Sequence, residues 1–162
     1  MKIIFKSLPE TAEAFTSMPE FNFSTPFQTA ALFIVAVCAY SKNKEACYNM
    51  IDAIKGPQKL SPLDKQFLRD RMMGKAEYLG KSFFAGATPQ NNYMPAQPYT
   101  IEVSETPYTY SEDGYAQVYV QSGGADNPRP IKLRKKGDEW LLWVHSGPLG
   151  DIRVPTANDP WA

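Results

Sequence analysis

Residues 131–145 carry four basic side chains followed by two tryptophans, and this segment is the one best suited to binding chemistry in this chain. A Gly-Asp pair at 137–138 signals a two-residue hairpin, so the flanking strands are expected to pair. That register places Lys132 opposite Trp143, with Arg134 on the same face. A basic, aromatic groove of this kind suits a carboxylate, a phosphate or an acidic peptide. The structural alternative is that the two basic side chains only shield Trp143 from water.

The connection of residues 123–130 is a second candidate, because it is longer than a hairpin needs. Its paired glycines allow the backbone to approach a ligand, and Arg129 is held stiffly between two prolines. Ordinary turn formation accounts for the same residues and is the simpler interpretation. A pocket between helices and sheet would use Arg129 together with Tyr108 and Tyr119.

Catalytic and metal chemistry are poorly supported by the composition. A single histidine, His145, excludes zinc sites built from several histidines, and two cysteines cannot complete the ligand set without carboxylates. Cys38 and Cys47 fall on apolar helical segments, where burial makes a thiol inert. We therefore predict no catalytic residue, no metal and no cofactor, and we favour a protein that is not an enzyme.

Charge and hydropathy argue against nucleic-acid-binding and membrane-spanning proteins. The 162 residues include 17 Lys plus Arg and 17 Asp plus Glu, so the net charge is zero, which disfavours nucleic acid as a partner. The most apolar run, residues 30–40, is too short to cross a bilayer. No signal peptide is expected at the N-terminus. With two cysteines in helical segments, reduced thiols and a cytoplasmic location are expected, without a membrane partner.

Four capping signals predict helices in the first half of the chain. The first helix is expected to run through Phe15, the second to about Tyr40, and the third to Gly56. The signals, in order, are Ser7 with Glu10 as a capping box, Thr25 before Pro26, Asn43, and Ser61 before Pro62.

The second half has the period of two that is typical of half-buried strands. Strands are expected near residues 99–104, on both sides of an Asp-Gly turn at 113–114, along 131–145, and briefly at 152–154. The turn at 113–114 would pair Tyr110 with Gln117 and Tyr108 with Tyr119.

Helices followed by antiparallel strands predict an α+β fold, with N-terminal helices packed on a C-terminal meander sheet of about four to five strands. One domain is expected over residues 1–162. Its parts are a helical part (1–85), a connecting loop (86–98), the sheet (99–155) and a C-terminal tail (156–162). In the tail, Trp161 either docks into its own domain or stays exposed as an anchor for a partner.

The run SGGADNPRPIKLRKKGDEWLLW from Ser122 to Trp143 resembles an uncharacterised bacterial family of domains of unknown function. The later DIRVP and DPWA segments match as well, and the resemblance extends over most of the chain. It implies a bacterial, intracellular domain that stands alone or serves as an accessory. It implies no activity, ligand or catalytic residue.

The leading hypothesis is a non-enzymatic binding or protein-interaction domain that uses the sheet surface and the 123–130 loop. Its partner would be another protein or an anionic small ligand. One alternative is a small-molecule enzyme or sensor with a pocket between helices and sheet. A second is an architectural unit that forms oligomers; the sequence leaves the oligomeric state open.

Overall fold

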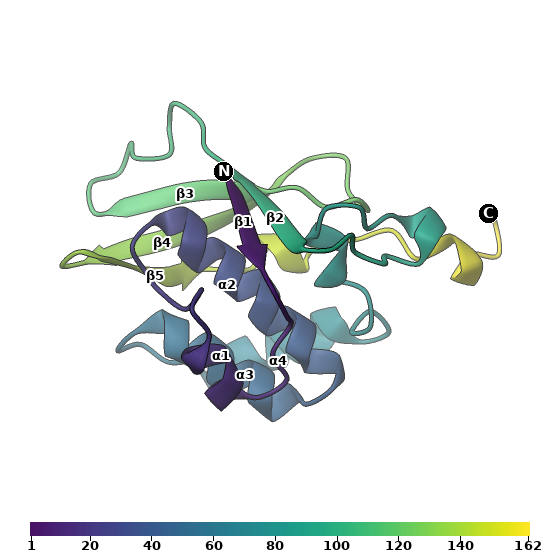
Figure 1. Cartoon of the computed structure of the whole chain (residues 1–162), viewed down its shortest axis with the longest axis horizontal. Coiled ribbons are helices and arrows are strands. Elements are labelled where there is room, and N and C mark those ends of the chain that lie inside the picture. The colour runs from purple at the N-terminus through teal and green to yellow at the C-terminus, as the bar shows by residue number, and fades with distance from the viewer.

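A five-stranded antiparallel sheet with helices packed on one side makes up the fold of residues 1–162 in the computed structural model (Figure 1). The α+β class and the meander are confirmed, since the strands lie side by side in chain order. The elements are β1 (Lys2–Phe5), α1 (Ala12–Ser17), α2 (Pro26–Cys38), η1 (Ala39–Ser41), α3 (Lys44–Lys55), α4 (Pro62–Met72), η2 (Lys81–Phe83), η3 (Pro89–Asn91), β2 (Tyr99–Ser104), β3 (Tyr115–Val120), β4 (Arg129–Lys136), β5 (Glu139–Val144), η4 (Gly147–Leu149) and η5 (Thr156–Asn158).

Side-chain caps begin the helices, and three of the four predicted starts are confirmed. Thr25, Asn43 and Ser61 each accept a hydrogen bond from a backbone N–H of the first turn. The first predicted start is wrong: Thr11, not Ser7, caps α1. Residues 6–10 between β1 and the cap form no helix. Helix α1 begins after Thr11, whose hydroxyl accepts a hydrogen bond from the Ala14 N–H at 3.1 Å.

Helix α2 is the centre of the molecule and touches all five strands as well as α3. Nearly every residue of it is buried, as expected for a helix that is apolar all round. Its one buried hydroxyl, on Thr29, donates to the carbonyl oxygen of Trp140 at 2.6 Å. In Figure 1 the helix lies between the sheet and the outer helices α1 and α3.

The β4–β5 hairpin turns at Gly137 and Asp138 as predicted, and Arg134 pairs with Leu141. Leu133 pairs with Leu142 as well, but at the next residue the predicted register is wrong: Lys132 pairs with Val144, not with Trp143. A bulge shifts the pairing between Lys132 and Leu133, which leaves Trp143 without a partner across the strands.

The pairing predicted across the Asp-Gly turn at 113–114 is wrong, because Tyr108 does not pair with Tyr119 and Tyr110 does not pair with Gln117. On this side β3 pairs with β2, through Val103 with Val120 and Ser104 with Tyr119. Residues 105–114 instead form a loop held by its own side chains. The Thr106 N–H donates to the Thr109 hydroxyl at 2.9 Å, and such local bonds compete with a sheet ladder.

The fifth strand is β1, which the sequence interpretation missed, and no strand forms at residues 152–154. β1 pairs with β2 along its whole length, including Ile3 with Ile101. Ile3 and Phe5 point into the core, whereas Lys2 and Ile4 face solvent. The N-terminal strand is therefore one edge of the sheet.

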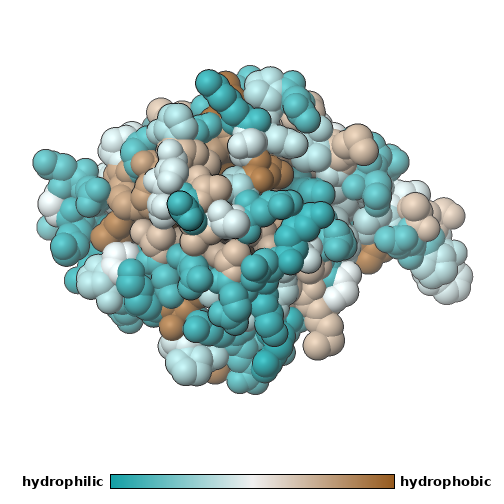
Figure 2. Space-filling view, turned by 60° about the horizontal axis from the view of Figure 1, so that its bottom comes forward, coloured by the Kyte–Doolittle hydropathy of each residue, from teal (hydrophilic) through white to brown (hydrophobic).

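One cluster of 37 buried residues joins the helices to the inner face of the sheet. Its members come from every one of the four helices and all five strands. Polar residues cover most of the surface on the helical side (Figure 2). No helix has both the length and the apolar character that a membrane span requires. In the tail, Trp161 is 93% exposed, so it does not dock into its own domain.

Candidate functional site

Arg134 is the centre of a basic and aromatic cluster on the outer face of β4 and β5. Its guanidinium carbon lies 4.6 Å from the centre of the Trp143 ring and 5.7 Å from that of Tyr115. The two rings are themselves 6.1 Å apart. Cation–π contacts of this kind hold the guanidinium in place while its N–H groups stay available to a ligand. No carboxylate forms an ion pair with Arg134.

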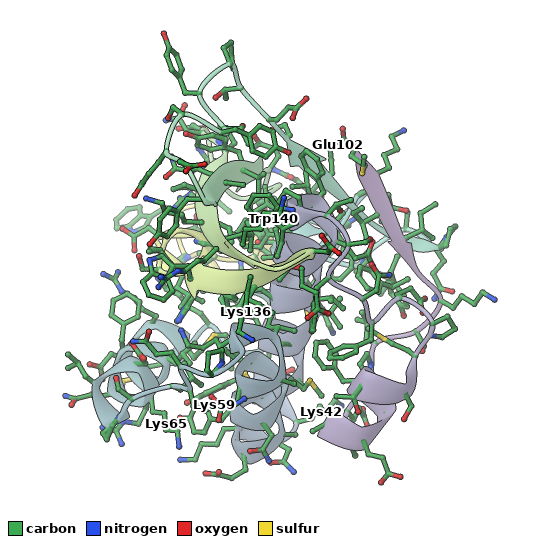
Figure 3. The ribbon with its side chains drawn as sticks, turned by 90° about the vertical axis from the view of Figure 1, so that its left-hand side faces the viewer. Lys42, Lys59, Lys65, Glu102, Lys136 and Trp140 are labelled. Atoms are coloured by element: carbon green, nitrogen blue, oxygen red, sulfur yellow. The ribbon has the colours of Figure 1, made fainter.

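A groove of about 310 Å³ opens beside this cluster, between the hairpin and the end of α3. Four cationic side chains line it and no carboxylate does, so its potential is positive although the chain as a whole is neutral. Figure 3 views the molecule from the hairpin side, with Lys136 and Trp140 labelled on the sheet. The lining residues are Lys55, Pro57, Gln58, Arg134, Lys135, Lys136, Leu141, Leu142 and Trp143.

Lys55 is the residue that the helical layer contributes to the cationic lining of the groove. It is the last residue of α3 and is buried, and burial lowers the pKa of its ammonium, although the carboxylates of Asp64 and Asp52 oppose the shift. Gly56 follows with φ of +71° and lies so close to Leu141 that a β-carbon there would meet the leucine at 2.5 Å. The sharp turn at Gly56 therefore presses the end of α3 against β5.

Lys132, Tyr108 and Tyr119 lie together, but in a separate cavity of about 130 Å³. The Lys132 ammonium is 2.5 Å from a carboxylate oxygen of Glu112 and 4.8 Å from the centre of the Tyr115 ring. Glu112 therefore neutralises the charge of Lys132 within the protein. Of the predicted residues, the structure thus brings Arg134 and Trp143 into the basic groove and Lys132 beside it.

Arg129 and the 123–130 loop lie at the other end of β4, away from the basic groove. The Arg129 guanidinium donates to the carbonyl oxygen of Asp151 at 2.6 Å and so holds the C-terminal segment to the sheet. A β-carbon on Gly123 would meet the carbonyl oxygen of Ala87 at 2.0 Å, and one on Gly124 the hydroxyl of Tyr93 at 2.1 Å. In this structure the two glycines allow close packing of neighbouring segments.

His145 follows β5 and is buried against Phe33, with the ring centres 5.3 Å apart. Burial lowers its pKa to about 4, the Lys55 ammonium acts in the same direction, and Asp64 acts in the opposite direction. Its Nδ1 atom has no hydrogen-bond partner. The imidazole is therefore neutral at pH 7 and enclosed in the core.

Sequence reasoning missed the three groove residues Lys55, Pro57 and Gln58. They lie more than 70 residues before Arg134 in the chain, and no local spacing links them to the hairpin. No group of three or more His, Cys, Asp or Glu side chains is arranged to hold a metal ion. The site is therefore a surface of cations and aromatic rings.

Comparison with known proteins gives one match. A family model described as "Domain of unknown function (DUF6935)" matches residues 7–156. No curated protein matches the chain, and no solved structure does.

Proposed function

The chain belongs to DUF6935, a family of domains of unknown function, and we propose that it is a non-enzymatic interaction domain that binds an acidic segment of another protein. The binding site is the basic groove between the β4–β5 hairpin and the end of α3. One observation carries the proposal: Lys55, Arg134, Lys135 and Lys136 line the groove without a single carboxylate.

The geometry favours a peptide over a small ion. Apolar groups of Leu141, Leu142 and Trp143 share the groove with the cations, so it suits a segment that carries both acidic and apolar side chains. The aromatic surface continues from Trp143 to Tyr115, beyond the groove itself. A half-buried tryptophan beside an arginine that stacks on it has the composition of an interface hot spot.

Other features support binding without catalysis. Burial raises the pKa of Cys38 to about 12, so this thiol stays protonated at neutral pH. His145 is buried, with only 8% of its surface exposed. Neither cysteine forms a disulfide, which supports a reducing compartment such as the cytoplasm.

Replacing Arg134 with glutamate is the direct mutational test. A fluorescently labelled hexaglutamate peptide carrying one leucine is expected to bind the native protein, with affinity falling as salt rises. The R134E variant should bind it about 10- to 100-fold more weakly, because a charge-assisted hydrogen bond contributes about 1.5–3 kcal/mol. Fluorescence anisotropy gives both dissociation constants.

The chain supplies a matched control in Arg71, which lies over the Phe67 ring at 5.0 Å on helix α4. Arg71→Glu makes the same charge change at an arginine stacked on an aromatic ring, outside the groove. This variant is expected to keep native affinity. The proposal fails if R134E and R71E bind alike, or if a single-stranded oligonucleotide binds the groove more tightly than the peptide.

A further inference from the structure

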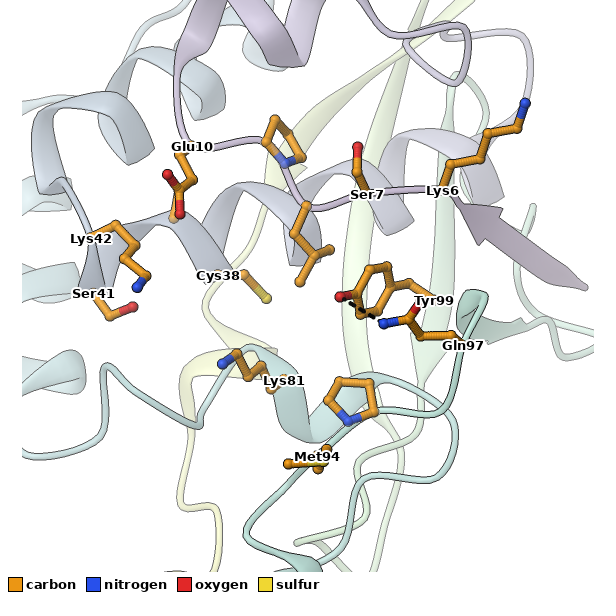
Figure 4. A pocket seen from close by; sticks show the side chains of 14 residues that line it. Lys6, Ser7, Glu10, Cys38, Ser41, Lys42, Lys81, Met94, Gln97 and Tyr99 are labelled. Atoms are coloured by element: carbon orange, nitrogen blue, oxygen red, sulfur yellow. Dashed lines mark hydrogen bonds between the residues drawn. The ribbon is translucent and has the colours of Figure 1, made fainter.

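A cavity of about 550 Å³ lies at the C-terminal end of α2. Its lining comes from residues 6–10 after β1, residues 38–42 at the end of α2, Lys81 of η2, and residues 94–99 before and at the start of β2. Cys38, Ala39 and Tyr99 lie in its wall (Figure 4). No residue of the basic groove lines this cavity.

The cavity carries an excess of positive charge. Lys6, Lys42 and Lys81 line it, against one carboxylate, that of Glu10. None of these four side chains forms an ion pair within the protein. In Figure 4, Lys42 and Lys81 extend toward the same end of the cavity, near Ser41, where the Glu10 carboxylate also lies, whereas Lys6 extends away. Lys42 and Lys81 are therefore the two ammonium groups that could meet one anion.

Apolar groups line much of the rest of the wall. Leu8, Met94 and Pro95 line it together with the ring of Tyr99. Tyr99 is fixed by an edge contact with Phe84, whose ring centre is 5.8 Å away. The cavity thus has a cationic end and an apolar wall, the combination that orients a small amphipathic ligand.

The cationic end is positioned by tight backbone packing. Gly80 lies so close to Cys38 that a β-carbon would meet the sulfur at 2.7 Å and the backbone nitrogen at 3.1 Å. This contact brings η2, and with it Lys81, against the end of α2. The pKa of the Cys38 thiol is raised by burial, with the Lys81 charge opposing, so the sulfur is a neutral part of the wall.

We propose that this cavity binds a small organic anion. Its phosphate or carboxylate group lies between Lys42 and Lys81 and accepts from the Ser41 hydroxyl, while its apolar part packs against Leu8 and Tyr99. Two ammonium groups and a hydroxyl suit an anionic oxygen group. The site is independent of the basic groove, so either assignment can fail without the other.

Isothermal titration with phenyl phosphate tests this site. Saturable 1:1 binding is expected, and Lys81→Gln should weaken it about tenfold through loss of one charge-assisted contact. Inorganic phosphate, which lacks the apolar part, should bind about tenfold more weakly. Phenylacetate shows whether a carboxylate serves as well as a phosphate; saturable binding of either anion supports the site.

Lys44→Gln is the matched control, because Lys44 lies two residues from Lys42 and is equally exposed but does not line the cavity. The Lys44→Gln and R134E variants should both bind phenyl phosphate with the affinity of the native protein. Equal affinities of the Lys42→Gln, Lys81→Gln and Lys44→Gln variants would overturn the proposal, as would the absence of saturable binding of both aromatic anions. Circular dichroism checks that each variant is folded.

Discussion

Replacing Phe5 with alanine is expected to lower the free energy of unfolding by about 3–5 kcal/mol, the usual cost of deleting a buried aromatic ring. Phe5 is 0% exposed at the end of β1 and belongs to the main core cluster. A domain of this size has about 5–15 kcal/mol in total, so the loss is a large part of its stability. Urea unfolding followed by circular dichroism measures it.

Ile4 provides the control on the same strand, because it is 52% exposed and faces the other side of the sheet. Ile4→Ala is expected to cost less than about 1 kcal/mol, as surface substitutions do. If Phe5→Ala and Ile4→Ala have the same small effect, β1 does not dock against the core, and the five-stranded sheet is wrong at that edge.

Acid is expected to destabilise the protein through His145 in a defined pH window. Because burial lowers its folded pKa to about 4, against an ordinary value of 6.5, the unfolded chain binds a proton first as pH falls. The stabilisation is fully present above pH 6.5 and is lost between about pH 6.5 and 4. The loss amounts to about 3 kcal/mol at pH 4, because each tenfold difference in proton affinity between the folded and unfolded chain corresponds to about 1.4 kcal/mol.

Two measurements separate this effect from the acid titration of carboxylates. His145 is the one histidine of the chain, so its ring proton resonance is unique and should not titrate between pH 7.5 and 5 in NMR spectra. His145→Phe should flatten the pH dependence of stability in the same window. Lys55 and Asp64 face the ring with opposite charges, and carboxylates such as Asp64 titrate lower. A measured pKa near 6.5 for His145 would contradict the buried, neutral imidazole.

Local signals predict most of the helical part because a capping side-chain oxygen needs only the N–H groups of its own first turn. Thr25, Asn43 and Ser61 begin helices for that reason, and the Gly137 turn begins a hairpin. β1 could not be predicted, since four residues that alternate in burial are too few to show a period. Its partner, β2, lies almost 100 residues later in the chain.

Part of the candidate site follows from strand periodicity, which places Arg134 and Trp143 near one another on one face. The bulge after Leu142 could not be predicted, because no glycine or other local signal in β5 marks it. The pairing of Lys132 with Glu112 depends on the conformation of residues 105–114. Hydrogen bonds to hydroxyl groups within this loop stabilise that conformation. Lys55 reaches the groove only through packing of α3 on β5.

NMR mapping of the hexaglutamate peptide on ¹⁵N-labelled protein tests the binding proposal most directly, because it locates the site without mutation. The account predicts that peptide addition shifts the backbone amide resonances of Lys55, Gln58 and residues 134–136 and 141–143, which line the basic groove. Resonances of the 123–130 loop and of the cavity around Lys42 and Lys81 should stay in place. Shifts confined to that loop or that cavity, or no shifts at saturating peptide, would contradict the assignment of the basic groove as the binding site.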